Sequence, residues 1–318
     1  MSSQATTADL AQCDDLGVDL GINMKREFKN KVASTRARLM NIARAEKIDF
    51  DFLLLRYFQE RFLYRLAFSE FSDHLVLKGG LLLICLKMPR SRPTKDIDFL
   101  AENIKNDPAE VEHIFRSIAE IPCDDGVKFF PSSVTSERIK EDANYEGIRI
   151  KIDATLGQAR KKLQMDIGFG DVIIPQTMQI EFPTLLEGNP PRLRVYSIES
   201  IISEKFEAMV KLAMINSRMK DFYDVYTLSV SNNFQSDSLK KAIESTFRKR
   251  KTSIPDNPLI FRLEFHRDKE KQKQWIAFLR KSRLNDVNKE FNEIMKRITS
   301  FLKPIVDSIK DETREDKT

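Results

Sequence analysis

The sequence predicts an α/β protein in which a core with a mixed β-sheet is followed by a helical C-terminal domain. Three stretches alternate polar with apolar residues, which is the period of β-strands: 148–152, 163–167 and 180–182. Beyond Pro190 and Pro191 the apolar residues recur instead at helical spacing. We therefore expect a flexible tail at 1–24, N-terminal helices plus the sheet core at 25–190, a helical domain at 191–310 and a charged tail at 311–318.

The composition restricts the class of protein. Of the 318 residues 41% are apolar, which is enough for a substantial core, and the net charge of +5 permits contact with nucleic acid. No apolar stretch approaches the roughly 20 residues of a membrane span, and three cysteines without a CxxC pattern indicate a reducing compartment. The chain has neither a GxSxG motif nor a P-loop, which argues against hydrolases and Walker-type ATPases. We expect a soluble, cytoplasmic protein without a membrane partner.

Helices are expected before and within the core. Residues 24–47 combine a cationic face with an apolar one, and residues 49–71 carry a wide aromatic stripe that indicates burial. A helix at 109–121 should begin after Asp107, with proline in its first turn, and a short strand should follow at 127–130.

The central feature is a twin-glycine turn followed by paired aspartates. Lys78-Gly79-Gly80 comes between an apolar strand and a helix-like apolar run, so its backbone N–H groups lie at a helix N-terminus, where phosphate binds. Asp96 and Asp98 alternate with apolar residues, so both carboxylates face one side of a strand. Because Mg²⁺ prefers carboxylate oxygens shared with substrate phosphates, the two features together indicate metal-dependent phosphoryl or nucleotidyl transfer.

A third carboxylate would complete a two-metal site, and two residues are candidates. Asp166 lies within the 163–167 stretch, and Asp153 follows the 148–152 stretch. Either could instead be an ordinary acidic residue at the end of a strand.

The second half of the chain adds a possible cation. Ser197 should cap a helix that carries Lys205, and another helix should start near Asp221. On sequence alone, Lys205 is most simply a surface lysine paired with a neighbouring glutamate. Later helices are expected at 236–250, 268–283 and 287–302, the last stopped by Pro304. Basic clusters at 248–251 and 280–283 could contact RNA phosphates or form a solvated surface.

These motifs occur in an order that resembles a known fold. A strand, Gly-Gly, a helix, a basic loop and an Asp-x-Asp strand resemble the minimal nucleotidyltransferase fold of the DNA polymerase β superfamily. The chain more closely resembles the AbiEii/AbiGii-type nucleotidyltransferase toxins of toxin–antitoxin and abortive-infection systems, in three blocks: Lys78-Gly79-Gly80 with Arg92-x-Thr94-x-Asp96-Ile97-Asp98, Leu163-Gln164-x-Asp166-Ile167-Gly168-x-Gly170-Asp171, and Glu204-Lys205 with Arg218-x-x-Asp221-x-Tyr223-Asp224. The resemblance favours Asp166 over Asp153. Gly80 departs from the superfamily, in which a Gly-Ser pair is usual.

The resemblance implies a function and a set of site residues. The chain would use Mg²⁺ to transfer NMP from an NTP to an acceptor, expected to be tRNA, and would block growth as a toxin with a cognate antitoxin. The metal ligands would be Asp96, Asp98 and Asp166. The triphosphate would be held by Lys78, the amides of Gly79 and Gly80, Arg92 and Lys205, with Thr94 and Asp221 positioning their neighbours. Two alternatives stay open: a kinase-like phosphotransferase on the same fold, and a catalytically silent NTP-binding protein.

Overall fold

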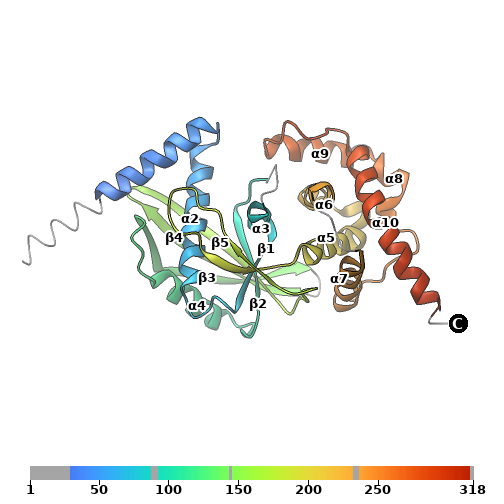
Figure 1. Ribbon diagram of the computed structural model, residues 1–318, viewed down its shortest axis with the longest axis horizontal. Helices are drawn as coiled ribbons and strands as arrows, with labels where there is room; N and C mark the ends of the chain where they lie inside the picture. Colours follow the sequence, from blue (N-terminus) through green and yellow to red (C-terminus); the bar gives the residue numbers. More distant parts are fainter. Residues whose placement is uncertain (1–28, 87–91, 143–144, 232–235, 316–318) are drawn as a thin grey trace, which may run out of the picture.

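The computed structural model describes residues 29–86, 92–142, 145–231 and 236–315. A seven-stranded mixed sheet with its covering helices forms one half of the molecule, and a bundle of helices forms the other (Figure 1). The predicted α/β class with a helical C-terminal part is therefore confirmed. The predicted tail at 1–24 and residues 316–318 lie outside the described residues.

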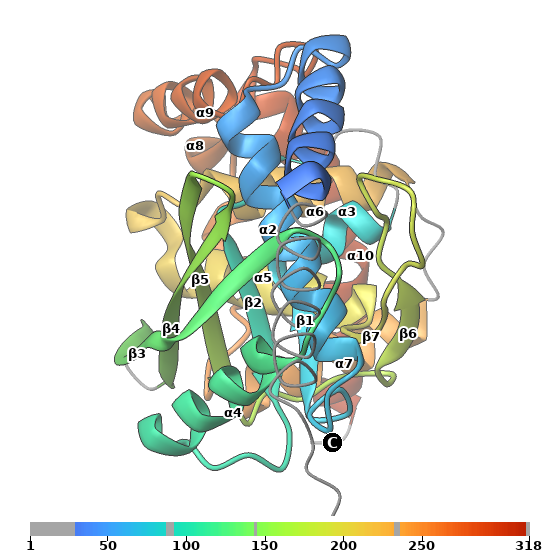
Figure 2. The ribbon, with the colours of Figure 1, turned by 90° about the vertical axis from the view of Figure 1, so that its left-hand side faces the viewer.

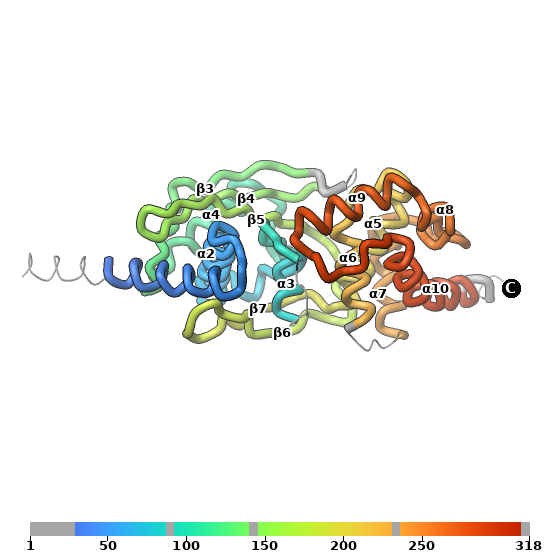
Figure 3. The backbone as a smooth tube through the Cα atoms, turned by 90° about the horizontal axis from the view of Figure 1, so that it is seen from above, coloured from blue at the N-terminus to red at the C-terminus, as the bar shows by residue number. Residues whose placement is uncertain are grey.

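The N-terminal helices match the sequence pattern. Residues 29–45 are helical and lie at the opposite end of the molecule from the C-terminal helix (Figure 3). Helix α2 (Phe50–Ala67) begins at Asp49, whose carboxylate accepts the backbone N–H of Asp51 and of Phe52. The aromatic stripe of α2 is core, as predicted, since Phe58 and Phe62 are fully buried. The helix ends at Ala67, earlier than the predicted residue 71, and turns lead to the first strand.

The sheet has the strand order β3-β4-β5-β2-β1-β7-β6. Its strands are β1 (Leu75–Lys78), β2 (Asp96–Ala101), β3 (Val127–Asp142), β4 (Tyr145–Leu156), β5 (Ala159–Phe169), β6 (Met178–Glu181) and β7 (Arg192–Val195). The pairs β2–β5 and β1–β7 are parallel, and the other neighbours are antiparallel. Strand β3 is much longer than the predicted 127–130 because its polar second half pairs with β4 as an edge strand. Strand β7 was not predicted, and it extends the sheet beyond the Pro190-Pro191 loop.

The two faces of the sheet serve different purposes. On β2, Ile97 and Phe99 are fully buried, and the Phe99 ring contacts Phe115 of α4 (Pro108–Glu120). Helices α2 and α4 cover this face, and the C-terminal helices lie on the other side of the sheet (Figure 2). Because successive side chains on a strand alternate, Asp96 and Asp98 face that other side. The short helix α3 (Gly79–Cys85) follows β1 directly, as the twin-glycine turn predicts.

The helical half contains α5 (Ile198–Leu212), α6 (Met219–Ser231), α7 (Ser236–Lys249), α8 (Leu263–His266), α9 (Lys269–Lys281) and α10 (Phe291–Glu315). Ser197 caps α5 as predicted, since its side chain accepts the Ser200 N–H at 3.2 Å. The prediction that Pro304 stops the last helix is wrong, since α10 continues to Glu315. Buried Val306 and Ile309 follow it at helical spacing, and their packing offsets the loss of one backbone hydrogen bond.

Among the described residues, no helix combines the length and the apolar character that crossing a membrane requires.

Candidate active site

Charged side chains form a row across four strands on the face that is turned toward the helical half. Lys78 of β1 is opposite Asp98 of β2, which is opposite Asp166 of β5. Arg149 of β4 is opposite Asp166 in turn. Residues directly opposite each other on neighbouring strands project from the same face of a sheet. The register therefore brings Asp98 and Asp166 together, and the rival Asp153 pairs elsewhere, with Lys162.

The twin-glycine turn fits closely against this row. Gly79 has a φ of +70°, which favours glycine, and a Cβ atom at this position would overlap Asp98 Oδ2. A Cβ atom at Gly80 would lie 2.9 Å from Thr94 Oγ1 and 3.2 Å from Arg92 Nη1. These contacts explain why the chain departs from a Gly-Ser pair, because a serine at residue 80 would need Thr94 to shift. Thr94 therefore packs against Gly80 of the turn, and it does not line the cavity described below.

Asp96 lies beside the row. It is half-buried, it precedes Asp98 by two residues on β2, and it is opposite Gln164 of β5. Burial raises the pKa of its carboxyl group, and the nearby charge of Asp166 raises it further. The contribution of Asp166 to this pKa shift reflects repulsion between the two carboxylates, which a divalent cation would relieve.

Asp166 already has a cationic partner. Arg149 binds both carboxylate oxygens, with Nε 2.8 Å from Oδ1 and Nη2 2.8 Å from Oδ2. In the described part of the chain, no group of three or more Asp, Glu, His or Cys side chains is arranged to hold a metal ion. The donor chemistry of Asp98 and Asp166, with Asp96 beside them, nevertheless suits Mg²⁺, which takes oxygen ligands. The carboxylates therefore fit the ion chemically once Asp166 is released from Arg149.

On the opposite wall lies a group of five charged side chains, here called the Lys205 cluster: Arg92, Lys205, Arg218, Asp221 and Asp224. Lys205 Nζ is 2.8 Å from Asp221 Oδ1 and 2.8 Å from Asp224 Oδ2. Arg92 makes two hydrogen bonds of 2.9 Å to the Asp224 carboxylate, although 132 residues separate them in the sequence. Arg218 Nε is 2.6 Å from Asp221 Oδ2.

The aspartates fix the charge states in the Lys205 cluster. Burial lowers the pKa of the Lys205 ammonium, but the charges of Asp221 and Asp224 outweigh it and the pKa rises. Burial likewise raises the pKa of Asp221, but Lys205 and Arg218 outweigh it and lower the pKa to about 2. Lys205 and Asp221 are therefore both charged at neutral pH.

A second group of five, here called the Arg250 cluster, joins the two halves of the molecule: Lys78, Asp171, Glu204, Glu207 and Arg250. Lys78 Nζ donates to Asp171 Oδ2 at 3.0 Å and lies 3.6 Å from Glu204 Oε2. Arg250 contacts Asp171 at 3.2 Å, Glu204 at 3.3 Å and Glu207 at 3.1 Å. Burial raises the pKa of Asp171, but the charges of Lys78 and Arg250 lower it below its usual range. Lys78 therefore lines the cavity with its ammonium held by acids.

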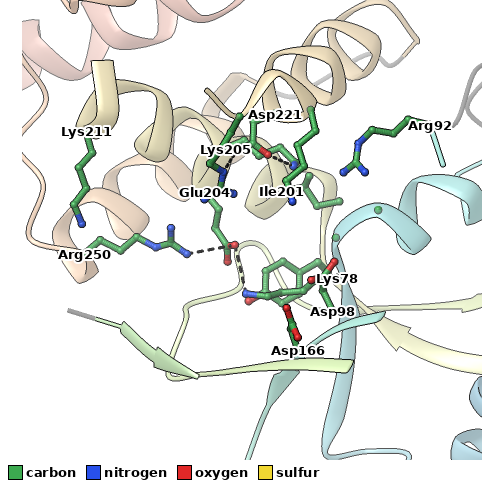
Figure 4. Close-up of a pocket in the computed structure, with 15 residues that line it drawn as sticks. Lys78, Arg92, Asp98, Asp166, Ile201, Glu204, Lys205, Lys211, Asp221 and Arg250 are labelled. Atoms are coloured by element: carbon green, nitrogen blue, oxygen red, sulfur yellow. Dashed lines mark hydrogen bonds and ion pairs between the residues drawn. The ribbon is translucent and has the colours of Figure 1, made fainter. Parts of the chain in front are cut away.

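Residues from the row and from both clusters line a cavity of about 380 Å³ (Figure 4). Eight of its lining residues were predicted from the sequence: Lys78, Gly79, Gly80, Arg92, Asp98, Asp166, Lys205 and Asp221. Seven were not: Tyr196, Ile201, Glu204, Lys211, Arg218, Lys220 and Arg250. Arg250 was predicted within a basic run at 248–251 that contacts RNA phosphates or forms a solvated surface, whereas its side chain points into the cavity. Asp96, predicted as a metal ligand, does not line the cavity.

Comparisons with known proteins identify the family of the chain. The family model "Nucleotidyl transferase AbiEii toxin, Type IV TA system" matches residues 61–297, which is more than half of the chain. The crystal structure of JHP933 from Helicobacter pylori is 14% identical with a TM-score of 0.47, covering 82% of this chain and 97% of that chain. A "putative nucleotidyltransferase from H. pylori" is 16% identical with a TM-score of 0.46, covering 80% and 97%. No curated protein matched. The family match shows that the chain belongs to the AbiEii nucleotidyl transferase toxins of type IV toxin–antitoxin systems.

Proposed function

We propose that this toxin uses Mg²⁺ to transfer NMP from an NTP to an RNA hydroxyl, with tRNA as the first acceptor to test. The observation that carries the proposal is the position of Asp98 and Asp166, opposite each other on parallel strands and facing a cavity that the twin-glycine turn and Lys205 also line. Nucleotidyl transfer needs carboxylates, backbone amides and cations at one cavity.

Each part has a defined task in the proposed reaction. Asp98 and Asp166, with Asp96 beside them, would hold the metal ion, which would polarise the phosphate and activate the acceptor hydroxyl. The Gly79 and Gly80 amides at the start of α3 bind phosphate oxygens. The acceptor hydroxyl would lose its proton to water as its oxygen bonds to the α-phosphorus. The bond from the α-phosphorus to the α–β bridging oxygen breaks, and pyrophosphate leaves with that oxygen.

Two cations would stabilise the leaving group. Lys205 and Arg92 offset the negative charge that develops on pyrophosphate, and Asp221 and Asp224 hold these two side chains in place. Lys78 is better assigned a structural role than a role in phosphate binding, because its ammonium donates a hydrogen bond to Asp171. We further propose that the protein acts in the cytoplasm, where NTPs and tRNA are available, and that a cognate antitoxin neutralises it.

The test is transfer of label from NTP to RNA. Purified protein is incubated with each α-³²P-labelled NTP, Mg²⁺ and total tRNA, and we expect labelled RNA with one or more of the nucleotides. Asp98→Asn should abolish labelling while the protein stays folded. Asp153→Asn is the matched control, because Asp153 is a buried carboxylate that pairs with Arg160 and does not line the cavity, and it should label as wild type does.

Three results would contradict the proposal. Undiminished labelling by Asp98→Asn would remove the metal-binding row from the reaction. Transfer of label from the γ-phosphate instead of the α-phosphate would identify a phosphotransferase. Calorimetric binding of the Mg²⁺–NTP complex without any labelled product would identify a catalytically silent nucleotide-binding protein.

A further inference from the structure

Arg149 stands between two carboxylates in the sheet. Asp166 is opposite it on β5, and Glu137 is opposite it on β3. The guanidinium makes its two 2.8 Å hydrogen bonds to Asp166, and its Nη1 lies 3.8 Å from Glu137 Oε1. The row on this face therefore continues from Asp98 through Asp166 and Arg149 to Glu137, so that the guanidinium has a second acceptor within reach.

A guanidinium and a divalent cation are poor joint partners for one carboxylate. Arg149 uses one lone pair of each Asp166 oxygen, and Gln164 Nε2 also approaches Oδ1 at 3.5 Å. A metal ion bound to the same oxygens would place its charge within a few ångströms of a guanidinium that cannot lose its proton. The side chains of Arg149 and Asp166 are 29% and 13% exposed, so solvent screens this repulsion only in part.

Glu137 is suited to receive the displaced guanidinium. Its side chain is 49% exposed, so an ion pair there costs little desolvation. Lys151 Nζ already holds Glu137 Oε1 at 2.9 Å, which keeps the carboxylate turned toward β4. The move from Asp166 to Glu137 requires only side-chain rotation, because all three residues are fixed by the register of β3, β4 and β5.

We propose that Arg149 and the divalent cation are alternative partners of Asp166, so that metal binding transfers Arg149 from Asp166 to Glu137. This inference rests on the proposed function, because it assumes that Asp166 is a metal ligand. Arg149 is then a positioning residue that sets metal affinity. Without metal, Arg149 reduces the repulsion between the carboxylates of Asp98 and Asp166. With metal bound, Arg149 leaves the cation site.

Direct metal binding tests the inference. Mn²⁺ is titrated into the full-length protein with a non-hydrolysable NTP, and free Mn²⁺ is measured by electron paramagnetic resonance. Arg149→Gln removes the competitor and should tighten Mn²⁺ binding by about tenfold, the lower end of the effect of residues that contact metal ligands. Glu137→Gln removes the negative charge of the second acceptor and should weaken Mn²⁺ binding by about threefold, a modest effect as for exposed ion pairs. In the double variant the effect of Glu137→Gln should disappear.

Arg160→Gln is the matched control, since Arg160 pairs with Asp153 as Arg149 pairs with Asp166, and it should bind Mn²⁺ as wild type does. Weaker or unchanged binding by Arg149→Gln, with wild-type binding intact, would overturn this inference and leave the proposed function standing. If neither wild type nor Arg149→Gln binds Mn²⁺, the metal assignment in the proposed function fails, and the inference fails with it.

Discussion

The two clusters of charged side chains at the cavity have opposite excess charge. The Lys205 cluster combines three cations with two carboxylates, whereas the Arg250 cluster combines two cations with three carboxylates. A triphosphate is attracted by the first cluster and repelled by the second. We therefore propose that the Lys205 cluster binds the substrate and that the Arg250 cluster joins the sheet to α5 and α7. Lining the same cavity does not give charged residues the same role.

The largest effect on the rate of NMP transfer is expected when a cation of the Lys205 cluster is removed. Lys205→Met should lower the rate of NMP transfer per folded molecule by about 10³-fold, as when a single charge-stabilising donor is lost. Lys205→Arg keeps the charge with a different shape and should recover at least about tenfold of that loss. Initial rates of label incorporation, normalised to the folded fraction from circular dichroism, check this. Lys205→Met activity above about a tenth of wild type would contradict the assignment.

Substitutions in the Arg250 cluster should lower the stability of the fold rather than the rate of NMP transfer. Arg250→Gln leaves Lys78 as the remaining cation among three buried or half-buried acids, so the free energy of unfolding should fall by about 3–5 kcal/mol. Arg248→Gln changes an exposed side chain near the same helix end and should shift it by less than about 0.5 kcal/mol. Urea unfolding measures both.

The rate per folded molecule separates the two clusters. Arg250→Gln should change it by less than about threefold, because this side chain is held by acids and not by substrate. A rate that falls a hundredfold with unchanged stability would instead place Arg250 in contact with the substrate, and the division between the clusters would be wrong.

The sequence predicts the parts of this site that depend on near neighbours. The Gly79-Gly80 turn, the alternation of Asp96 and Asp98 and the Ser197 cap each follow from residues a few positions apart. The clusters do not, because they depend on long-range contacts such as the one between Arg92 and Asp224. Arg250 was missed for the same reason. Its basic neighbours predict a surface, and only the position where α7 ends against α5 turns it inward.

Two secondary-structure predictions failed because packing and pairing outweighed local signals. Pro304 is a strong stop signal, yet the buried apolar residues that follow it keep α10 helical. Strand β7 has only four residues after a proline pair, and it forms because β1 and β6 offer it partners on both sides. The role of Arg149 was likewise invisible in the sequence, since it is set by strand register.

Protonation of Asp221 in the Lys205 cluster at low pH should have a smaller effect, which is on the free energy of unfolding. The pKa of Asp221 is about 2 in the folded protein, below the ordinary 3.8, because Lys205 and Arg218 outweigh its burial. A lowered carboxyl pKa stabilises the fold above the unfolded pKa, and this contribution is lost as pH falls through the folded pKa. Asp221 should thus contribute roughly 2 kcal/mol that disappears between about pH 4 and pH 2.

The comparison with Asp221→Asn isolates this contribution. Asparagine cannot titrate, so between pH 4 and pH 2 the free energy of unfolding of the variant should fall by roughly 2 kcal/mol less than that of wild type. Asp171, whose pKa is also lowered, titrates in both proteins, so its contribution cancels in the difference. Urea unfolding at several pH values gives the two curves. Parallel curves would mean that Lys205 and Arg218 do not lower the pKa of Asp221 in the folded protein, which would contradict the ion pairing within the Lys205 cluster.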